Sequence, residues 1–327
     1  MMIKNIVLFS FFLTYLLFFS LLYSKETQIK EINLIGDILD PNNEISGMDW
    51  YKESLFLLPE NINNYIFMIP RKRIQKYLLS KKNFPIHPKK ISFSAPNYKN
   101  LIKGFEGFEA IAFFKNQVFI LIETNFNNHM SSYIAWGIID PNTYQIYIKD
   151  ENLIKIDTPI QINNMAYESI IIKDKMAILL YEANGVNLQK NVHHRIFSLD
   201  NYSVSKIKGF NLEYRITDAT KLDLHNKFWC INYFWPGENN KLKPENVFKI
   251  KDSQKIKVNK KLKTVEQLVE CEVINDSIIR SKREPIQLKL ENGTSRNWEG
   301  LVRYEKDSFL IVTDKYPRMI LGFIQHN

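Results

Sequence analysis

A hairpin pattern recurs five times along this chain of 327 residues and sets narrow limits on how it can fold. In each copy a polar residue opens a short apolar strand, a turn follows, and a second apolar strand ends at another polar residue. The pairs, 14 or 15 residues apart, are Ser46 with Glu60, Glu109 with Glu123, Glu168 with Glu182, Asp218 with Asn232, and Glu299 with Asp314. Two antiparallel strands of similar length bring the chain back to its starting level, so both polar residues of a pair lie at one edge of a sheet.

The regular spacing of short apolar strands predicts an all-β fold. Long helical periodicity is nearly absent, and residues 73–79 are the one modest helix candidate. Short strands with internal self-similarity favour a single β-propeller, in which sheets called blades are arranged around a central axis. We prefer five blades, although the long interval between Asp218 and Glu299 leaves six open. We expect residues 28–34 to pair with the last blade and close the ring.

The N-terminal segment has the layout of an export signal. Residues 6–23 form an almost unbroken apolar run of 18, preceded by Lys4 and followed by Lys25 and Glu26. A run of this length is also at the lower limit for crossing a bilayer. We therefore expect residues 1–24 to act as a signal peptide or as an N-terminal anchor. Residues 25–327 would then form one monomeric propeller domain that is secreted or periplasmic and meets the membrane only through an uncleaved leader.

The five opening residues form a candidate metal site. In a radial array they converge on the axis, where several carboxylates would repel one another unless a cation held them. The set consists of Ser46, Glu109, Glu168, Asp218 and Glu299. Carboxylate and hydroxyl oxygens in a loose cage favour calcium, and a water-filled funnel is the alternative. Any one of these residues taken alone is more typical of an ordinary polar group at the start of a strand.

A second polar set closes the same hairpins and leads into loops. As catalytic candidates we take the closing carboxylates Glu60, Glu123, Glu182 and Asp314, beside which a metal-held water could attack a phosphate ester. As candidates for substrate binding we take Lys315, Arg318, Arg195, Trp235, Asn125 and Asn184. Arg and Lys next to metal-bound carboxylates suit a phosphate or carboxylate ligand. For each loop residue the alternative is an exposed polar side chain with no functional role.

Four short phrases resemble those of known secreted propellers. They are Ser46-Gly-Met-Asp-Trp, Phe108-Glu-Ala-Ile-Ala-Phe, Tyr167-Glu-Ser-Ile-Ile and Asn297-Trp-Glu-Gly-Leu-Val. These phrases resemble the phytase-like esterase group, and the order of the opening residues is similar to that of the calcium-activated nucleotidase (apyrase) family of five-bladed propellers. The resemblance implies one axial calcium ion held by the five opening residues. Asp218 departs from the apyrase pattern, which more often has serine there. Fold resemblance does not fix function.

Composition excludes several other classes. The chain has no phosphate-cradling glycine loop, no Gly-x-Ser-x-Gly elbow and no zinc-type cysteine spacing. The net charge of +9 comes largely from residues 241–263, where nine lysines face two acidic residues. We interpret residues 238–263 as a solvated insertion in the fourth blade, with attraction to acidic surfaces as the alternative, and we exclude nucleic acid because stacking aromatics are missing from the run. Cys230 and Cys271 fall in strands of one blade and are compatible with either a disulfide or two buried thiols.

Two functions remain open at this level. One is a metal-dependent hydrolase of phosphate or other esters of small anionic molecules, of the phytase-like or apyrase-like kind. The other is a non-catalytic propeller whose calcium only staples the blades and whose open face binds a protein, a glycan or a cell-wall ligand.

Overall fold

The computed structural model describes residues 26–61, 64–245, 264–291 and 294–326. Strands dominate these residues and the helices are short, so the predicted all-β class is confirmed. The proposed signal segment, residues 1–24, and residues 246–263 of the Lys-rich insertion lie outside the described residues. In the described part of the chain, no helix combines the length and the apolar character that a membrane crossing requires.

The strands follow one another in antiparallel runs of four. The first run contains β2 (Ile45–Tyr51), β3 (Ser54–Pro59), β4 (Tyr65–Pro70) and β5 (Lys89–Ser94). The second contains β6 (Phe105–Phe114), β7 (Gln117–Phe126), β8 (His129–Ile139) and β9 (Ile146–Asp157). The third contains β10 (Tyr167–Lys173), β11 (Met176–Tyr181), β12 (His193–Ser198) and β13 (Val204–Lys208).

The later runs follow the same plan with two variations. The next run contains β14 (Arg215–Ala219), β15 (Lys227–Phe234), β16 (Val265–Ile274) and β17 (Ser277–Arg280), with the short β18 (Ile286–Gln287) also paired to β16. The last run contains β19 (Trp298–Glu305), β20 (Ser308–Thr313), β21 (Leu321–Gln325) and, from the other end of the chain, β1 (Ile29–Ile32).

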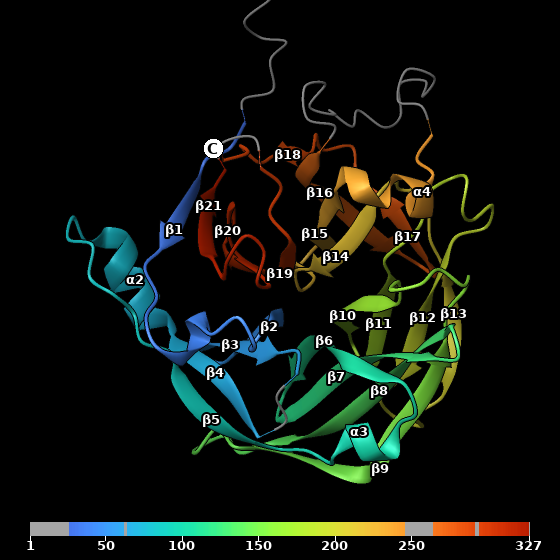
Figure 1. Cartoon of the computed structure of the whole chain (residues 1–327), viewed down its shortest axis with the longest axis horizontal. Helices are drawn as coiled ribbons and strands as arrows, with labels where there is room; N and C mark the ends of the chain where they lie inside the picture. Colours follow the sequence, from blue (N-terminus) through green and yellow to red (C-terminus); the bar gives the residue numbers. More distant parts are fainter. Residues whose placement is uncertain (1–25, 62–63, 246–263, 292–293, 327) are drawn as a thin grey trace, which may run out of the picture.

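The predicted ring closure is confirmed by β1. This strand pairs with β21 along its whole length, from Ile29 opposite Ile324 to Ile32 opposite Leu321. Without β1, β21 would present a row of unpaired backbone groups, which is a liability that propellers remove by pairing their two ends. The N-terminal and C-terminal parts of the described chain therefore share one sheet, as Figure 1 shows.

The first strands of the runs form a closed ring around the axis. Contacts join β2 to β6, β6 to β10, β10 to β14, β14 to β19, and β19 back to β2. Figure 1 shows these strands around the middle of the molecule with the later strands of each run farther out. Residues far apart in the chain are thus brought together at the axis, which is the condition that the candidate site requires.

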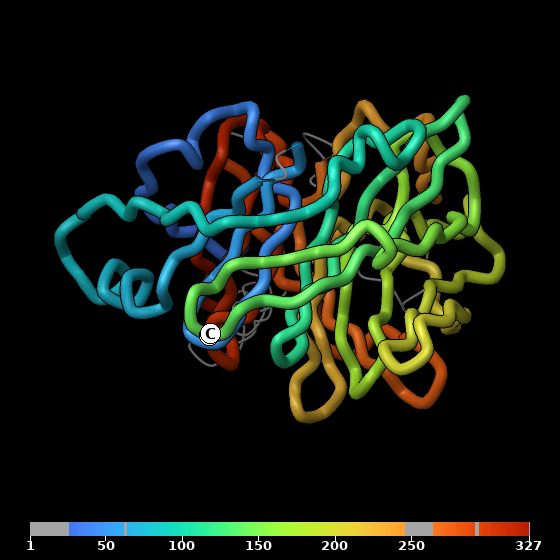
Figure 2. Tube along the Cα trace, turned by 90° about the horizontal axis from the view of Figure 1, so that it is seen from below, coloured from blue at the N-terminus to red at the C-terminus, as the bar shows by residue number. Residues whose placement is uncertain are grey.

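The outermost strands join some neighbouring runs into larger sheets. Strand β5 pairs in parallel with β9, and β13 pairs in parallel with β17, so two sheets contain eight and nine strands. Figure 2 shows the β5 and β9 segments side by side at the edge of the molecule. Pairing the outer strands covers edges that would otherwise be exposed.

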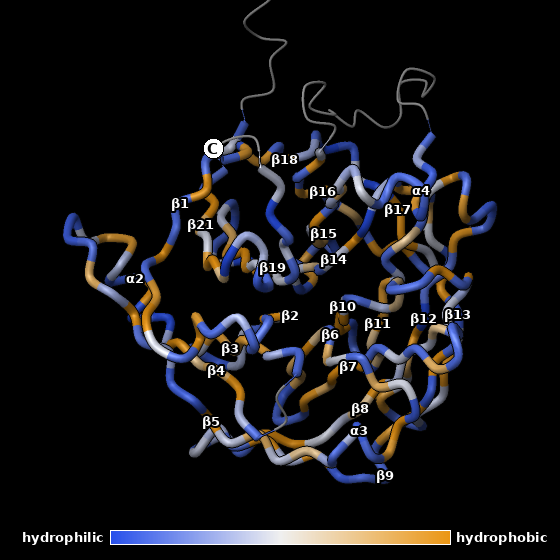
Figure 3. Tube along the Cα trace, in the orientation of Figure 1, coloured by the Kyte–Doolittle hydropathy of each residue, from blue (hydrophilic) through white to orange (hydrophobic). Residues whose placement is uncertain are grey.

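Apolar side chains fill the space between neighbouring runs. Strand β3 is buried at every position, because sheets pack against both of its faces, and this explains why it appears in sequence as a continuous apolar run. Phe56 of the first run contacts Phe113 of the second, with ring centroids 5.1 Å apart. Figure 3 shows the hydrophobic colour concentrated along such strands. The core is therefore a series of layers between sheets, and the polar residues are left for the axis and the rims.

Helices are few, as predicted. The helix candidate is confirmed as α2 (Arg71–Leu79), which packs Ile74 and Tyr77 against the first run. The other helical segments, none longer than four residues, are η1 (Asp37–Leu39), α3 (Tyr98–Leu101), η2 (Pro236–Glu238) and α4 (Asn239–Leu242). Cys230 and Cys271 are buried free thiols with their sulfur atoms 4.0 Å apart on β15 and β16.

Candidate functional site

Each of the five opening residues lies at an irregularity in the innermost strand of its run. The register of β2 with β3 shifts around Ser46, that of β6 with β7 around Glu109, that of β10 with β11 around Glu168, that of β14 with β15 around Asp218, and that of β19 with β20 around Glu299. A β-bulge places an extra residue in one strand and changes the direction of its side chain. The regular sequence spacing therefore corresponds to a structurally equivalent position, repeated around the axis.

Carboxylates of the opening and closing sets meet at the axis. Desolvation by burial, followed by repulsion from neighbouring carboxylates, raises the pKa values of Glu109 and Glu168 well above the ordinary value. Burial, followed by a hydrogen bond with and repulsion from the Glu44 carboxyl group, raises the pKa of Glu60 to about 8, and burial with repulsion from Glu182 raises that of Glu123 to about 8. We call the group the axial cluster; its members are Glu60, Glu109, Glu123, Glu168, Glu182, Glu299 and Arg215.

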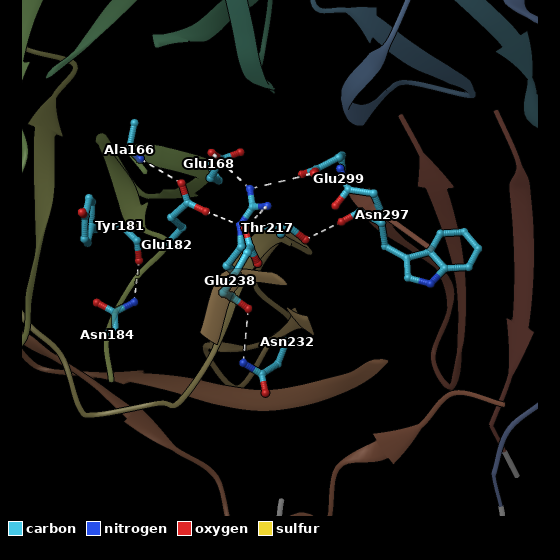
Figure 4. A network of polar contacts seen from close by, with 12 residues as sticks. Ala166, Glu168, Tyr181, Glu182, Asn184, Thr217, Asn232, Glu238, Asn297 and Glu299 are labelled. Carbon is cyan, nitrogen blue, oxygen red and sulfur yellow. Dashed lines mark hydrogen bonds and ion pairs between the residues drawn. The ribbon is translucent and has the colours of Figure 1, made fainter. Parts of the chain in front are cut away.

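Arg215, at the start of β14, is the cation of the axial cluster. Its Nε donates to Glu182, and its Nη2 lies 4.0 Å from an oxygen of Glu168 and 4.0 Å from an oxygen of Glu299. Its Nη1 lies 3.4 Å from Glu238. Figure 4 shows Glu168 and Glu182 on one side of this network, Glu299 on the other, and Glu238 below. One buried guanidinium therefore organises carboxylates from four segments of the chain.

Arg215 was not among the residues predicted from sequence. The available signal was weak, because Arg215 lies in a short apolar strand three residues before Asp218 and outside the hairpin pattern. Arginine is almost never fully buried unless it is paired, so an arginine within a buried strand does indicate nearby carboxylates. Glu238, the last residue of η2, was also missed, because it falls inside the segment interpreted as a solvated insertion.

Two members of the predicted calcium set have other partners. The Asp218 carboxylate accepts a hydrogen bond from the backbone N–H of Leu301 at 2.6 Å, on the adjacent inner strand. The Ser46 hydroxyl is 3.5 Å from the carbonyl oxygen of Leu58, within its own hairpin. Glu109, Glu168 and Glu299 are the members that lie near one another.

A tighter group of oxygens lies within the axial cluster. One carboxylate oxygen from each of Glu123, Glu168 and Glu182 lies within 4.8 Å of the other two, and all three residues are buried. Oε1 of Glu123 is buried without a hydrogen-bond partner. Buried polar atoms are normally paired, so an orphan carboxylate oxygen calls for a cation, a proton or a water. The chemistry of this oxygen-only group fits a hard divalent cation such as calcium.

A cavity of about 300 Å³ lies beside the axial cluster. Its lining residues are Arg215, Tyr233, Trp235, Glu238, Asn297 and Tyr316. Trp235 and Tyr316 are about half exposed, at 50% and 52%. The cavity joins the axial network through Arg215 and Glu238, so a small molecule bound there would lie next to the carboxylates.

The remaining predicted site residues lie at different distances from this cavity. Asp314 is linked to it, because it accepts hydrogen bonds from the side chain of Asn297 at 2.8 Å and from the backbone of Tyr316 at 2.6 Å. Burial raises the pKa of Asp314. Lys315 and Arg318 are exposed and are paired with Glu44 and Glu31, respectively.

The other three polar candidates make local contacts instead. Asn184 is fully buried, and its amide donates to the carbonyl of Tyr181 at 2.5 Å. Asn125 donates to the side chain of Asn163. Arg195 lies on β12, the third strand of its run, and donates to the carbonyl of Asp157. Of the predicted substrate-binding set, Trp235 alone lines the cavity.

Comparisons with known proteins support the architecture. No protein-family model matches the chain, and no curated protein matches it. Among solved structures, a thermostable family-43 glycoside hydrolase shares 10% identity over 87% of this chain and 90% of its own, with a TM-score of 0.50. A structure from the GH130 family of mannoside phosphorylases, which contains glycoside hydrolases that target β-1,2-mannosidic linkages in Candida mannan, shares 10% identity over 92% and 94%, with a TM-score of 0.51.

At this level of identity the likeness shows the fold alone. These two neighbours are β-propeller-like enzymes, which agrees with the ring of inner strands. None of the named structures belongs to the phytase-like esterase group or to the apyrase family, so that resemblance rests on the sequence phrases. The chain is thus an all-β protein with a β-propeller-like fold and a carboxylate-rich axis.

Proposed function

We propose that this protein is a hydrolase, built as a five-bladed propeller, whose reaction takes place where the axial cluster meets the Trp235–Tyr316 cavity. The observation that carries the proposal is the position of Arg215. It lines the cavity and is simultaneously in contact with carboxylates on both sides. Hydrolases that cleave glycosidic bonds use two carboxyl groups placed on either side of the bond.

The geometry assigns different tasks to the two sides. Glu182 is ion-paired with Arg215 and accepts a hydrogen bond from the backbone N–H of Ala166 at 2.9 Å, so it is a fixed carboxylate suited to act as a base. Glu299, at 4.0 Å from Arg215, is less tightly held and suits the role of proton donor. In glycosidases the two carboxyl groups flank the bond that is cleaved, and Glu182 and Glu299 lie on opposite sides of Arg215 in Figure 4.

Calcium is part of the proposal as a resident cation. Glu123 and Glu168, with Glu182 beside them, are the residues that would hold it. Bound there, the ion would neutralise part of the surplus negative charge and polarise an oxygen next to it. The orphan oxygen of Glu123 supports this position, and the all-oxygen chemistry of the group supports calcium over softer metals.

The candidate substrates are glycosides, phosphate esters and carboxylate esters, and the charges around the cavity favour glycosides. Esters of phosphate or of other small anions need unpaired cations, whereas Arg215, Lys315 and Arg318 already have carboxylate partners. Glycosides need carboxyl groups and no free cation. The fold neighbours with TM-scores of 0.50 and 0.51 are named as glycoside-cleaving families, which is compatible with this preference. We therefore place glycosides before esters.

The test is a substrate panel with two variants. Purified protein is assayed on chromogenic glycosides, phosphate esters and carboxylate esters, each with calcium and with chelator. We expect hydrolysis of one or more glycosides, and Glu182→Gln or Glu299→Gln should lower kcat by about 10²- to 10⁴-fold, the usual contribution of a positioned acid or base. Glu305→Gln, at the exposed end of the same strand as Glu299, is the matched control and should leave the rate unchanged.

Two outcomes contradict the proposal. One is turnover that survives both substitutions, because the reaction would then occur elsewhere. The other is the absence of turnover on every class, combined with a calcium effect on melting temperature alone. The second result would favour the alternative of a calcium-stapled binding propeller.

A further inference from the structure

The cavity beside the axial cluster has the features of a subsite for an uncharged sugar. We propose that it binds a neutral saccharide whose ring stacks on Trp235, and that it discriminates against phosphorylated or carboxylated ligands. This inference rests on the proposed function for the fate of the bound ligand. The binding itself is argued from the cavity alone.

Trp235 packs against the Gly237 backbone and is also accessible from the cavity. A Cβ built on Gly237 would lie only 1.9 Å from the indole ring, so the ring lies directly against the Gly237 backbone. Trp235 also lines the cavity, and the residue remains half exposed. Aromatic rings offer large, rigid and partly apolar contact surfaces with few rotatable bonds. A glycine at position 237 thus lets the indole lie flat, as a platform does.

Tyr316 supplies a second exposed aromatic ring to the cavity lining. It follows β20, whereas Trp235 follows β15, so the two rings come from neighbouring runs. Tyr233 also lines the cavity, and its hydroxyl is paired with that of Ser295 at 2.7 Å. The exposed rings are therefore Trp235 and Tyr316, and they bound a space of about 300 Å³, at the small end for a ligand pocket.

The cavity contains a hydrogen-bond acceptor that a ligand hydroxyl could satisfy. Oε1 of Glu238 contacts Arg215, whereas its Oε2 is buried without a hydrogen-bond partner. A ligand hydroxyl would donate to that oxygen and remove the cost of leaving it unpaired. The side chain of Asn297 also lines the cavity, although its amide already donates to Asp314.

The charges around the cavity disfavour an anion. Arg215 faces four carboxylates, those of Glu168, Glu182, Glu238 and Glu299. Lys315, next to Tyr316 in the chain, is paired with Glu44 at 2.7 Å. A phosphate or carboxylate on the ligand would thus find no unpaired cation there and would have to displace an existing ion pair of Arg215 or Lys315. A neutral polyol meets neither cost.

Binding is tested without turnover. The Glu299→Gln variant is titrated with methyl glycosides and neutral disaccharides of glucose, mannose, xylose and arabinose, and with the matching sugar phosphates and uronic acids. Tryptophan fluorescence and ligand-observed NMR report the binding. Trp235 is the one exposed residue among the five tryptophans, so quenching reports chiefly on it. We expect one neutral sugar to bind at least tenfold more tightly than its phosphorylated and carboxylated forms.

Three substitutions in the same background identify the platform. Trp235→Ala should weaken binding at least tenfold, and Trp235→Phe should recover part of it. Gly237→Ala keeps the indole but pushes it off the backbone, so it should weaken binding while the melting temperature stays near that of the parent. Tyr147→Ala removes an exposed aromatic ring from β9 on the outer edge and should have no effect.

The outcomes separate this inference from the proposed function. Equal or tighter binding of the charged sugars, or unchanged binding in both Trp235→Ala and Gly237→Ala, would overturn the saccharide subsite. Neutral sugar binding that depends on Trp235, in a wild-type protein that cleaves no glycoside, would uphold the subsite and remove the hydrolase. Cleavage of glycosides with no dependence on Trp235 would support the hydrolase and overturn the saccharide subsite.

Discussion

Two groups of buried carboxylates lie on the inner strands or at the ends of the strands next to them, and they differ in how their charge is compensated. In the first, Asp49 and Asp218, which we call the aspartate pair, accept backbone hydrogen bonds across the ring. Asp49 accepts from Phe113 of the next run at 2.8 Å, and Asp218 accepts from Leu301 at 2.6 Å. Lys221 adds a salt bridge to Asp49 at 2.9 Å. These carboxylates fasten neighbouring inner strands to each other.

In the second group, the axial cluster, carboxylates outnumber their donors. Arg215 is paired with three of the six glutamates, namely Glu168, Glu182 and Glu299, and the Oε1 atom of Glu123 has no partner. Burial raises pKa values in both groups, those of Asp49 and Asp218 as well as that of Glu299. A raised pKa alone therefore does not mark the functional site. The two groups differ in hydrogen bonding. The carboxylates of the aspartate pair have hydrogen-bond partners and a structural role, whereas the unpaired oxygen of the axial cluster is available to bind a ligand.

The largest expected effect concerns Arg215. Arg215→Met removes the cation that the axial cluster surrounds, leaving buried carboxylates uncompensated, and should lower the free energy of unfolding by about 3–5 kcal/mol. Urea denaturation measures it. Lys315→Met breaks a half-exposed pair and should cost at most about 1 kcal/mol. Equal losses in the two variants would show that Arg215 is not the organising cation.

The gain in stability on calcium binding is expected to distinguish the two groups. The ion should raise the stability of the wild type, by about 2.7 kcal/mol when its concentration is 100 times Kd. Glu123→Gln should abolish most of that gain, because it removes the orphan oxygen from the group of three carboxylates. Asp218→Asn should retain the gain. The reverse result, measured by melting temperature with and without chelator, would restore the ligand set predicted from sequence.

A smaller effect is expected from exchanging one carboxylate in each group. Asp218→Asn weakens the hydrogen bond from Leu301 and should cost about 1–3 kcal/mol in the free energy of unfolding. Glu168→Gln relieves repulsion in the axial cluster and should be neutral or stabilising in the absence of metal. Denaturant titrations at neutral pH measure the free energy of unfolding of both variants. A larger loss in Glu168→Gln than in Asp218→Asn would contradict this prediction.

The effect that is smallest near neutral pH is a pH dependence that lies outside both groups. His194 is buried and its Nδ1 accepts from the backbone N–H of Tyr181 at 3.0 Å; burial lowers its pKa to about 3. The unfolded chain takes up this proton below about pH 6.5, whereas the folded chain does not. Stability should therefore hold above that pH and fall between pH 6.5 and 3, by about 1.4 kcal/mol per pH unit from this residue.

The control for this prediction is a second histidine. His194→Gln should flatten the slope of unfolding free energy against pH, whereas substitution of the exposed His225 should not. Denaturation at several pH values between 4 and 7 measures both. An unchanged slope in His194→Gln would mean that the buried imidazole takes up its proton without unfolding.

The positions of the opening residues were predictable because the hairpin is a local unit. Antiparallel strands joined by a tight turn fix the level at which Glu109 and Glu123 end, whatever the rest of the chain does. The same reasoning correctly predicted the pairing of residues 28–34 with the last strands, since an unpaired edge is costly. The blade count of five and the calcium set stay predictions.

The roles of Asp218 and Arg215 were not predictable in this way. Aspartate is one methylene shorter than glutamate, so the Asp218 carboxylate stays close to the inner strands. There it accepts a hydrogen bond from the backbone of Leu301, 83 residues away in sequence. Arg215 is not one of the repeated polar residues of the hairpin pattern, and its carboxylate partners come from four other segments of the chain. Nothing local to either residue reveals those partners.

The amino-acid sequence by itself thus determined the strands, the repeat and the level at which polar residues would lie, because these depend on the alternation and length of short segments. Only the tertiary structure decided which buried carboxylates are satisfied and which are left for a ligand. Hydrogen-bond partners at the axis come from strands that become neighbours when the ring closes, and the free energy of a buried charge depends on those partners more than on its place in the chain.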